Sequence, residues 1–132
     1  MSGRSRGDPG DLLDMATGLL QRADPATAGL WPRVSALLAL QALESSVRRL
    51  WLGHTLEFQG CSMRAQLICL PSYLDDNGLA SRTGHAWSAL SRACHHHTYE
   101  LAPTAGELQS WFLVVRELIQ KVGLAPGPHA RA

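Results

Sequence analysis

Apolar residues recur every three or four positions along most of this chain, and they almost never alternate with polar residues as in a strand. The longest such stretch lies within 32–52, where the apolar residues share one helical face: Leu37, Leu40, Leu43, Val47, Leu50 and Trp51. An earlier stretch predicts a helix over 9–23, with Asp8 as its N-cap and Pro9 in its first turn. The first part of the chain is therefore predicted to hold two amphipathic helices.

The next part of the chain carries the pattern of two more helices. A short helix is expected to start near Ser62 and to end or kink at Pro71. Its apolar residues are Met63, Leu67, Ile68 and Leu70. A longer helix is predicted over 79–100, with one apolar seam: Leu79, Thr83, Ala86, Trp87, Leu90, Cys94, His97 and Leu101.

A last helix is predicted after Pro103, a residue that forces the chain out of the preceding helix. Thr104 and Glu107 are spaced as a capping box, in which each side chain binds a backbone amide of the other residue. Gly123 is the expected end of this helix. Five amphipathic helices with short connections predict an all-α, up-and-down bundle.

The length of the chain, 132 residues, corresponds to one domain. The helical bundle is predicted to span 9–122. A flexible tail is expected at 1–8 and a disordered tail at 123–132, because the second segment contains Gly and Pro and little that could pack.

Charge is nearly balanced, with 12 Lys and Arg against 11 Asp and Glu. The chain therefore has no field strong enough to recruit a nucleic acid or a membrane, and any site for a polyanion must be local. No apolar run approaches the roughly 20 residues of a membrane span, and the N-terminal segment lacks the apolar stretch of a secretory signal. Cys61, Cys69 and Cys94 lack the spacing of a disulfide framework, so we expect reduced, buried thiols in a cytoplasmic protein.

The segment from Arg92 to Glu100 concentrates the side chains that could perform chemistry. A guanidinium matches phosphate oxygens, and an imidazole moves protons near neutral pH. At about 100° per residue on a continuing helix, Arg92 and His97 flank an arc that contains His96 and Glu100, and Tyr99 lies beside Arg92. A ligand between Arg92 and His97 could be a phosphodiester, and its cleavage would need no metal.

These residues resemble a known family. Arg92 and His97 have the R-x4-H spacing of HEPN domains, and Tyr99 extends the motif to R-x4-H-x-Y. The longer form resembles HEPN toxins that are paired with nucleotidyltransferase antitoxins, and the wider sequence is similar to an actinobacterial HEPN subgroup. The resemblance implies an all-α bundle that forms a homodimer, with two copies of the motif across a shared cleft.

The resemblance also implies an activity, that of a metal-independent endoribonuclease acting on RNA. Arg92 would bind the scissile phosphate, and His97 would be the general acid or base. Tyr99 would be the residue that a nucleotidyltransferase-type antitoxin modifies, and His96 and Glu100 would line the site. No cofactor and no metal are expected.

The sequence leaves other interpretations open. Active members of the family often have a polar residue directly after the motif arginine, where this chain has Ala93. A non-catalytic HEPN module that binds a nucleotide, RNA or a protein partner is therefore the alternative. His97 also falls on the apolar seam, where a histidine would belong to the core, and Arg92 could be an ordinary surface cation. Zinc is not expected, because the adjacent residues 94–97 diverge around a helix and cannot meet at one ion.

Overall fold

The computed structural model describes residues 8–22, 31–52, 54, 60–95 and 101–124. These residues form five α-helices: α1 (Pro9–Gln21), α2 (Trp31–Leu52), α3 (Met63–Leu74), α4 (Asn77–Cys94) and α5 (Ala105–Leu124). The described ranges contain no β-strand. The prediction of an all-α bundle of about five helices is confirmed.

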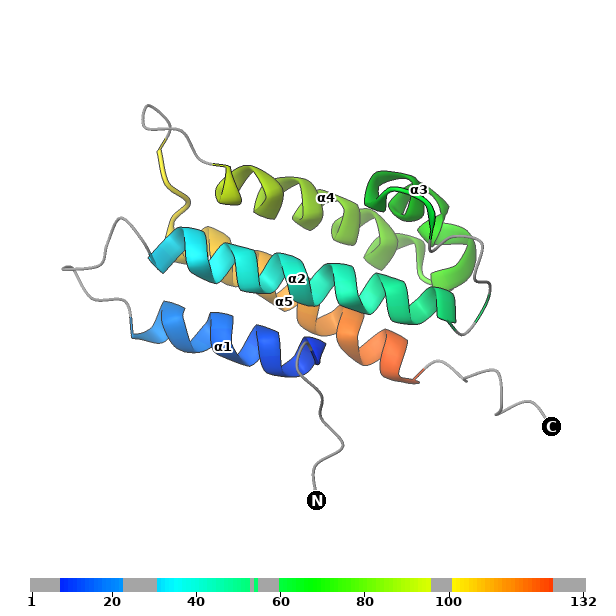
Figure 1. The fold of residues 1–132 in the computed structure, drawn as a ribbon, viewed down its shortest axis with the longest axis horizontal. Coiled ribbons are helices and arrows are strands. Elements are labelled where there is room, and N and C mark those ends of the chain that lie inside the picture. The colour runs from blue at the N-terminus through cyan, green and yellow to red at the C-terminus, as the bar shows by residue number, and fades with distance from the viewer. Residues whose placement is uncertain (1–7, 23–30, 53, 55–59, 96–100, 125–132) are drawn as a thin grey trace, which may run out of the picture.

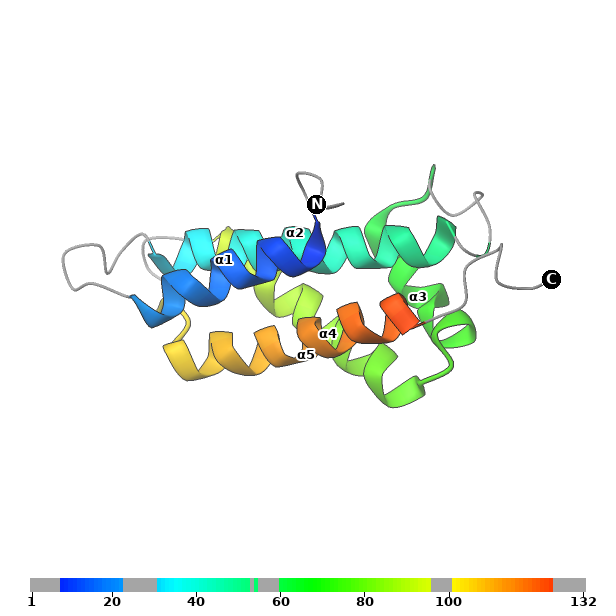
Figure 2. The same cartoon turned by 90° about the horizontal axis from the view of Figure 1, so that it is seen from below.

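The four longer helices lie side by side and alternate in direction, as Figures 1 and 2 show, and α3 lies across one end of α4. Helix α2 is central, because it packs against α1, α4, α5 and α3. Helix α5 closes the bundle by packing against both α1 and α4. The start of α5 therefore lies beside the end of α4, and the candidate site is at this end of the bundle.

The core follows the apolar stripe predicted for α2. Leu43, Val47 and Trp51 are completely buried, and Leu50 is nearly so. They meet buried side chains from the other helices: Leu13, Leu70, Leu90, Leu108, Val115 and Leu118. Each large apolar side chain buried in this way contributes about 1.5–3 kcal/mol. Leu37, which the sequence placed at the margin of the stripe, remains substantially exposed.

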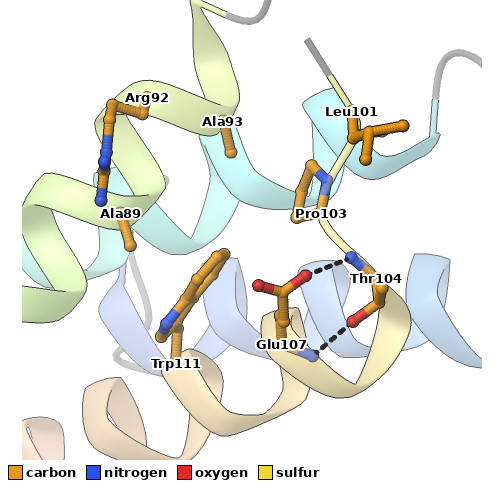
Figure 3. A pocket seen from close by; sticks show the side chains of 9 residues that line it. Ala89, Arg92, Ala93, Leu101, Pro103, Thr104, Glu107 and Trp111 are labelled. Carbon is orange, nitrogen blue, oxygen red and sulfur yellow. Dashed lines mark hydrogen bonds between the residues drawn. The ribbon is translucent and has the colours of Figure 1, made fainter.

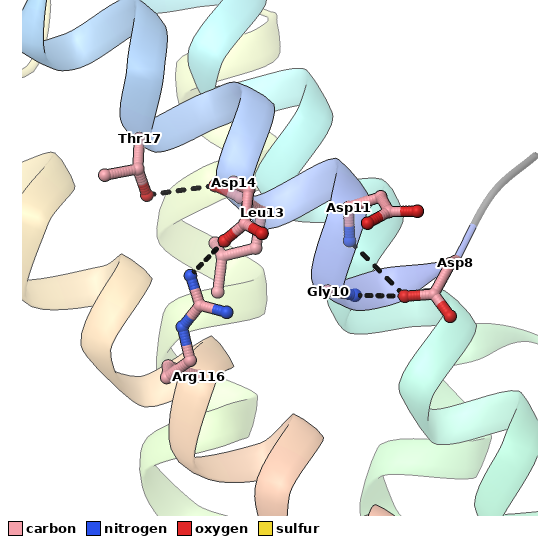
Figure 4. A network of polar contacts seen from close by, with 7 residues as sticks. All are labelled: Asp8, Gly10, Asp11, Leu13, Asp14, Thr17 and Arg116. Atoms are coloured by element: carbon pink, nitrogen blue, oxygen red, sulfur yellow. Dashed lines mark hydrogen bonds and ion pairs between the residues drawn. The ribbon is translucent and has the colours of Figure 1, made fainter. Parts of the chain in front are cut away.

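Polar side chains fix where the helices begin. The Asp8 carboxylate accepts hydrogen bonds from the Gly10 and Asp11 amides at 2.9 and 3.3 Å, as Figure 4 shows, so Asp8 is the predicted cap of α1. The same view shows Arg116 of α5 paired with Asp14 of α1 at 2.7 Å. Each N-cap supplies about 1 kcal/mol, whereas an exposed ion pair contributes less.

Helix α3 does not end at Pro71, one of the two predicted outcomes, but continues through it to Leu74. Proline removes one backbone hydrogen bond, but Leu70 and Leu74 on either side of it are buried in the core, and this packing offsets the loss. Asp75 then ends the helix in the left-handed conformation, with φ 59°. Ile68 is 73% exposed, so its apolar side chain does not belong to the core.

The other helix ends differ by a few residues. Helix α4 begins at Asn77, because the Asp76 carboxylate accepts a hydrogen bond from the Leu79 amide at 2.9 Å. Helix α5 continues through Gly123 to Leu124. The predicted domain limit at 122 is therefore two residues short of the last helical residue, and residues 123–124 of the predicted tail at 123–132 are helical. Asp8, assigned to the predicted tail at 1–8, caps α1, and the rest of the two tails, 1–7 and 125–132, lies outside the described residues.

Two substitutions test this core. Leu90→Ala is expected to lower the free energy of unfolding by about 2–5 kcal/mol, because the side chain is completely buried between α4 and its neighbours. Ile68→Ala should change it by no more than about 0.5 kcal/mol, because its side chain is exposed. Urea unfolding followed by circular dichroism measures both, and equal losses would contradict this assignment of the core.

Candidate functional site

The candidate site begins where α4 ends. The helix stops at Cys94, and the His95 amide caps it by donating to the carbonyl oxygens of Ser91 and Arg92, both at 3.2 Å. The prediction that this helix continues to Glu100 is therefore wrong. Histidine, threonine and tyrosine are weaker helix formers than the alanine and leucine that precede them. Their intrinsic preferences therefore do not favour extension of the helix.

This early end removes the continuous helical arc on which the sequence placed Arg92 and His97 together. Arg92 lies in the last turn of α4, and its side chain is exposed. The other four predicted site residues, His96, His97, Tyr99 and Glu100, lie outside the described residues. Their roles stay predictions, and the described part of the site is built around Arg92.

Arg92 lines a pocket of about 440 Å³ between the end of α4 and the start of α5 (Figure 3). Its volume is within the range of small-molecule sites, roughly 300–1,000 Å³. Apolar walls come from Ala89 and Ala93 of α4 and from Leu101 and Pro103 of the segment that leads into α5. Leu101 is 98% exposed, so it does not extend the buried seam of α4 as predicted.

The start of α5 supplies the remaining wall of the pocket. Thr104 and Glu107 form the predicted capping box: the Thr104 amide donates to Glu107 Oε1 at 3.0 Å, and the Glu107 amide donates to Thr104 Oγ1 at 3.1 Å. Trp111 follows one turn later and is half-buried beside the pocket. Figure 3 shows Arg92 at one end of this group, Glu107 with Thr104 at the other, and Trp111 between them.

The Arg92 guanidinium is available for a ligand. Among the residues that the structure describes, none forms an ion pair or a side-chain hydrogen bond with it. Other arginines are engaged: Arg82 contacts Glu117 at 2.8 Å, and Arg116 contacts Asp14 at 2.7 Å. The full set of guanidinium donors on Arg92 is therefore free to bind an anion at the pocket mouth.

Trp111 and Glu107 are the site residues that the sequence interpretation missed. The sequence pattern indicated only a capping-box role for Glu107 and gave no role to Trp111. A usable signal was present, because residues four apart on a helix share one face. Arg92, the third residue of the group, is distant from Glu107 and Trp111 in the sequence. Only the antiparallel packing of α4 and α5 brings the three residues to one pocket.

Cys94, at the end of α4, has a partly buried thiol. Burial raises the pKa of its thiol; Arg33 lowers it in part, and Glu44 adds to the rise. Glu44 is itself held half-buried, because its carboxylate accepts a hydrogen bond from Trp87 Nε1 at 2.9 Å. None of the three cysteines forms a disulfide. Cys61 is exposed, and Cys69 and Cys94 are only partly buried, so the expectation of three buried thiols is wrong.

The described ranges contain no group of three or more His, Cys, Asp or Glu side chains placed to hold a metal ion. No helix within those ranges has both the length and the apolar content needed to cross a membrane. Comparisons of the chain with protein-family models, with curated proteins and with solved structures find no match.

Thiol alkylation tests the environment of Cys94. Iodoacetamide at pH 8 is expected to modify Cys61 faster than Cys94, because the thiolate is the nucleophile and burial keeps the Cys94 thiol protonated. The folded state favours the protonated Cys94 thiol, because its pKa is raised above the ordinary thiol pKa of 9.0. The contribution of this thiol to the free energy of unfolding should therefore fall as the pH rises above 9.0.

Peptide mass spectrometry measures the two alkylation rates, and the same reaction in urea is the control, where the rates should converge. A native-state rate at Cys94 equal to that at Cys61 would contradict the assignment of a shielded thiol.

Proposed function

We propose that this protein is a metal-independent endoribonuclease of the HEPN type. The observation that carries the proposal is the Arg92 guanidinium, which is exposed, has no partner among the described residues and lines an open pocket. An arginine in that position can bind a phosphodiester. The R-x4-H-x-Y spacing, which continues to His97 and Tyr99, supports the assignment to RNA.

The proposed reaction is an internal transfer at phosphorus. The 2′-hydroxyl oxygen attacks the phosphorus atom, and the bond to the 5′-oxygen of the next nucleotide breaks. The proton of the 2′-hydroxyl passes to a base, and an acid supplies a proton to the departing 5′-oxygen. Arg92 would offset the charge that develops on the non-bridging oxygens, and His97 would transfer one of the two protons.

The remaining assignments complete this proposal. The protein acts as a homodimer in the cytoplasm, where a second copy of the motif faces the first. Tyr99 is the point at which a nucleotidyltransferase-type antitoxin would modify and silence the toxin, and His96 and Glu100 line the site. These roles follow from the family resemblance of the motif.

A non-catalytic binding module is the second candidate, and Ala93 favours it. This residue is 6% exposed and packs between the pocket and the core, so its position offers the ligand no polar group beside Arg92. A module of this kind would bind nucleotide, RNA or a protein partner through the same pocket without cleaving RNA.

Cleavage of a mixed RNA substrate by the purified chain separates the two candidates. His97→Ala is expected to lower the cleavage rate by roughly 10²–10⁴-fold, as the loss of a general acid or base does. Arg92→Ala should lower it by roughly 10²–10³-fold, through the loss of a group that stabilises the transition state.

Matched controls come from α4 itself. Arg82→Ala removes a surface arginine whose partner is Glu117, and His85→Ala removes an exposed histidine, so both should retain the wild-type rate. If the wild-type protein at high concentration binds RNA through Arg92 but leaves it intact, the result would contradict the ribonuclease and support the binding module.

A further inference from the structure

The pocket beside Arg92 contains more than a phosphate-binding group. Its opposite end carries the Glu107 carboxylate, and the Trp111 indole lies between the two charges (Figure 3). A site for phosphate alone would gain nothing from a carboxylate in the same pocket, because two anions repel each other. A ligand that reaches both ends of this pocket is therefore expected to be anionic at Arg92 and to present hydrogen-bond donors to Glu107.

Trp111 is suited to the middle of such a ligand. Its side chain is half-buried against the core, which holds the ring in place while part of its surface faces the pocket. Unpaired bases of RNA stack on aromatic rings of this kind. The small side chains of Ala89 and Ala93 on the facing helix leave room for a flat ring against the indole.

Glu107 decides which base fits. Its Oε1 atom accepts a hydrogen bond from the Thr104 amide, and no described residue donates to Oε2. A carboxylate only accepts hydrogen bonds, and its two oxygens have about four positions for donors, so capacity remains after the capping bond. The base edge that faces Glu107 must therefore present donors.

Guanine meets this requirement best. Its Watson–Crick edge presents two neighbouring donors, N1–H and the N2 amino group, which one carboxylate can accept together. Adenine and cytosine each place a single amino group next to a ring acceptor that would face the carboxylate unfavourably. Uracil has one N–H between two carbonyl groups, which a carboxylate repels.

We infer that the pocket formed by Arg92, Glu107 and Trp111 binds a guanine nucleotide of RNA, with the phosphate at Arg92, the base on Trp111 and the Watson–Crick edge at Glu107. This inference rests on the proposed function for its substrate class, because it names the base next to the phosphate that Arg92 binds. It also predicts binding of the isolated nucleotide, which needs no catalysis.

The test is a titration of the full chain with the four ribonucleoside 5′-monophosphates, followed by calorimetry and by NMR of the indole N–H signals. The chain has four tryptophans, and Trp111→Phe identifies the signal of Trp111. We expect the guanine nucleotide to bind about tenfold more tightly than the others and to shift that signal. Trp111→Leu should weaken binding of every nucleotide about tenfold, and Trp111→Phe should restore part of it.

Glu107→Gln is the sharpest variant, because glutamine also serves in a capping box and keeps an oxygen for the Thr104 amide. It should fold as the wild type does but lose most of the preference for guanine, about tenfold. Glu117→Gln, an equal change on an exposed residue of the same helix, is the control and should retain the preference. Thermal unfolding of each variant separates a lost contact from a lost fold.

The outcomes distinguish this inference from the proposed function. If guanine nucleotide binding depends on Glu107 but the protein leaves RNA uncut, the result supports the guanine site and contradicts the proposed ribonuclease activity. If RNA is cleaved without base preference and the rate is unchanged by Glu107→Gln, the result supports the ribonuclease activity and overturns the guanine site. A chain that binds none of the four nucleotides, but whose dimer dissociates when Trp111 is replaced, overturns the inference and makes the pocket a contact between copies.

Discussion

The structure depends on the burial of one apolar face of α2. Leu43, Val47 and Trp51 lie along this face and have no exposure to solvent, and the helix that carries them packs against all four of the others. Because hydrophobic burial has no direction of its own, the positions of the neighbouring helices are set by how their own apolar stripes meet α2. The short connection between α4 and α5 makes these two helices antiparallel, and their packing against α2 sets the place of the pocket.

Polar contacts then separate the arginines that hold the bundle together from one that lines a pocket without a partner among the described residues. Arg82 and Arg116 each bind a carboxylate on another helix, and Trp87 donates to Glu44 across α2 and α4. These contacts tie neighbouring helices together at the surface. Arg92 has no such partner among the described residues, and it lines a pocket. The arginines of α4 and α5 are chemically alike, and their neighbours give them different roles.

The capping box shows how one side chain serves both structure and site. Glu107 starts α5 by accepting from the Thr104 amide, and the same carboxylate lines the pocket opposite Arg92. Helix starts favour acidic residues because backbone amides point toward them. The carboxylate is therefore held in place by the fold before any ligand arrives, and a preorganised group of this kind costs little to orient on binding.

Residue pattern alone accounts for much of this protein, including the five helices, the buried stripe of α2, the cap at Asp8 and the box at Thr104 and Glu107. These features follow from contacts within a few positions of the chain, where helical spacing is decisive. Local preference fails where packing competes with it. Pro71 stays helical between the buried residues Leu70 and Leu74, and Ile68 stays exposed. The end of α4 at Cys94 differs, because there the apolar pattern predicted a helix that the weaker helix formers after it do not continue. The meeting of Arg92 with Trp111 could not be read from spacing, since it exists only because two antiparallel helices bring distant residues to one end of the bundle.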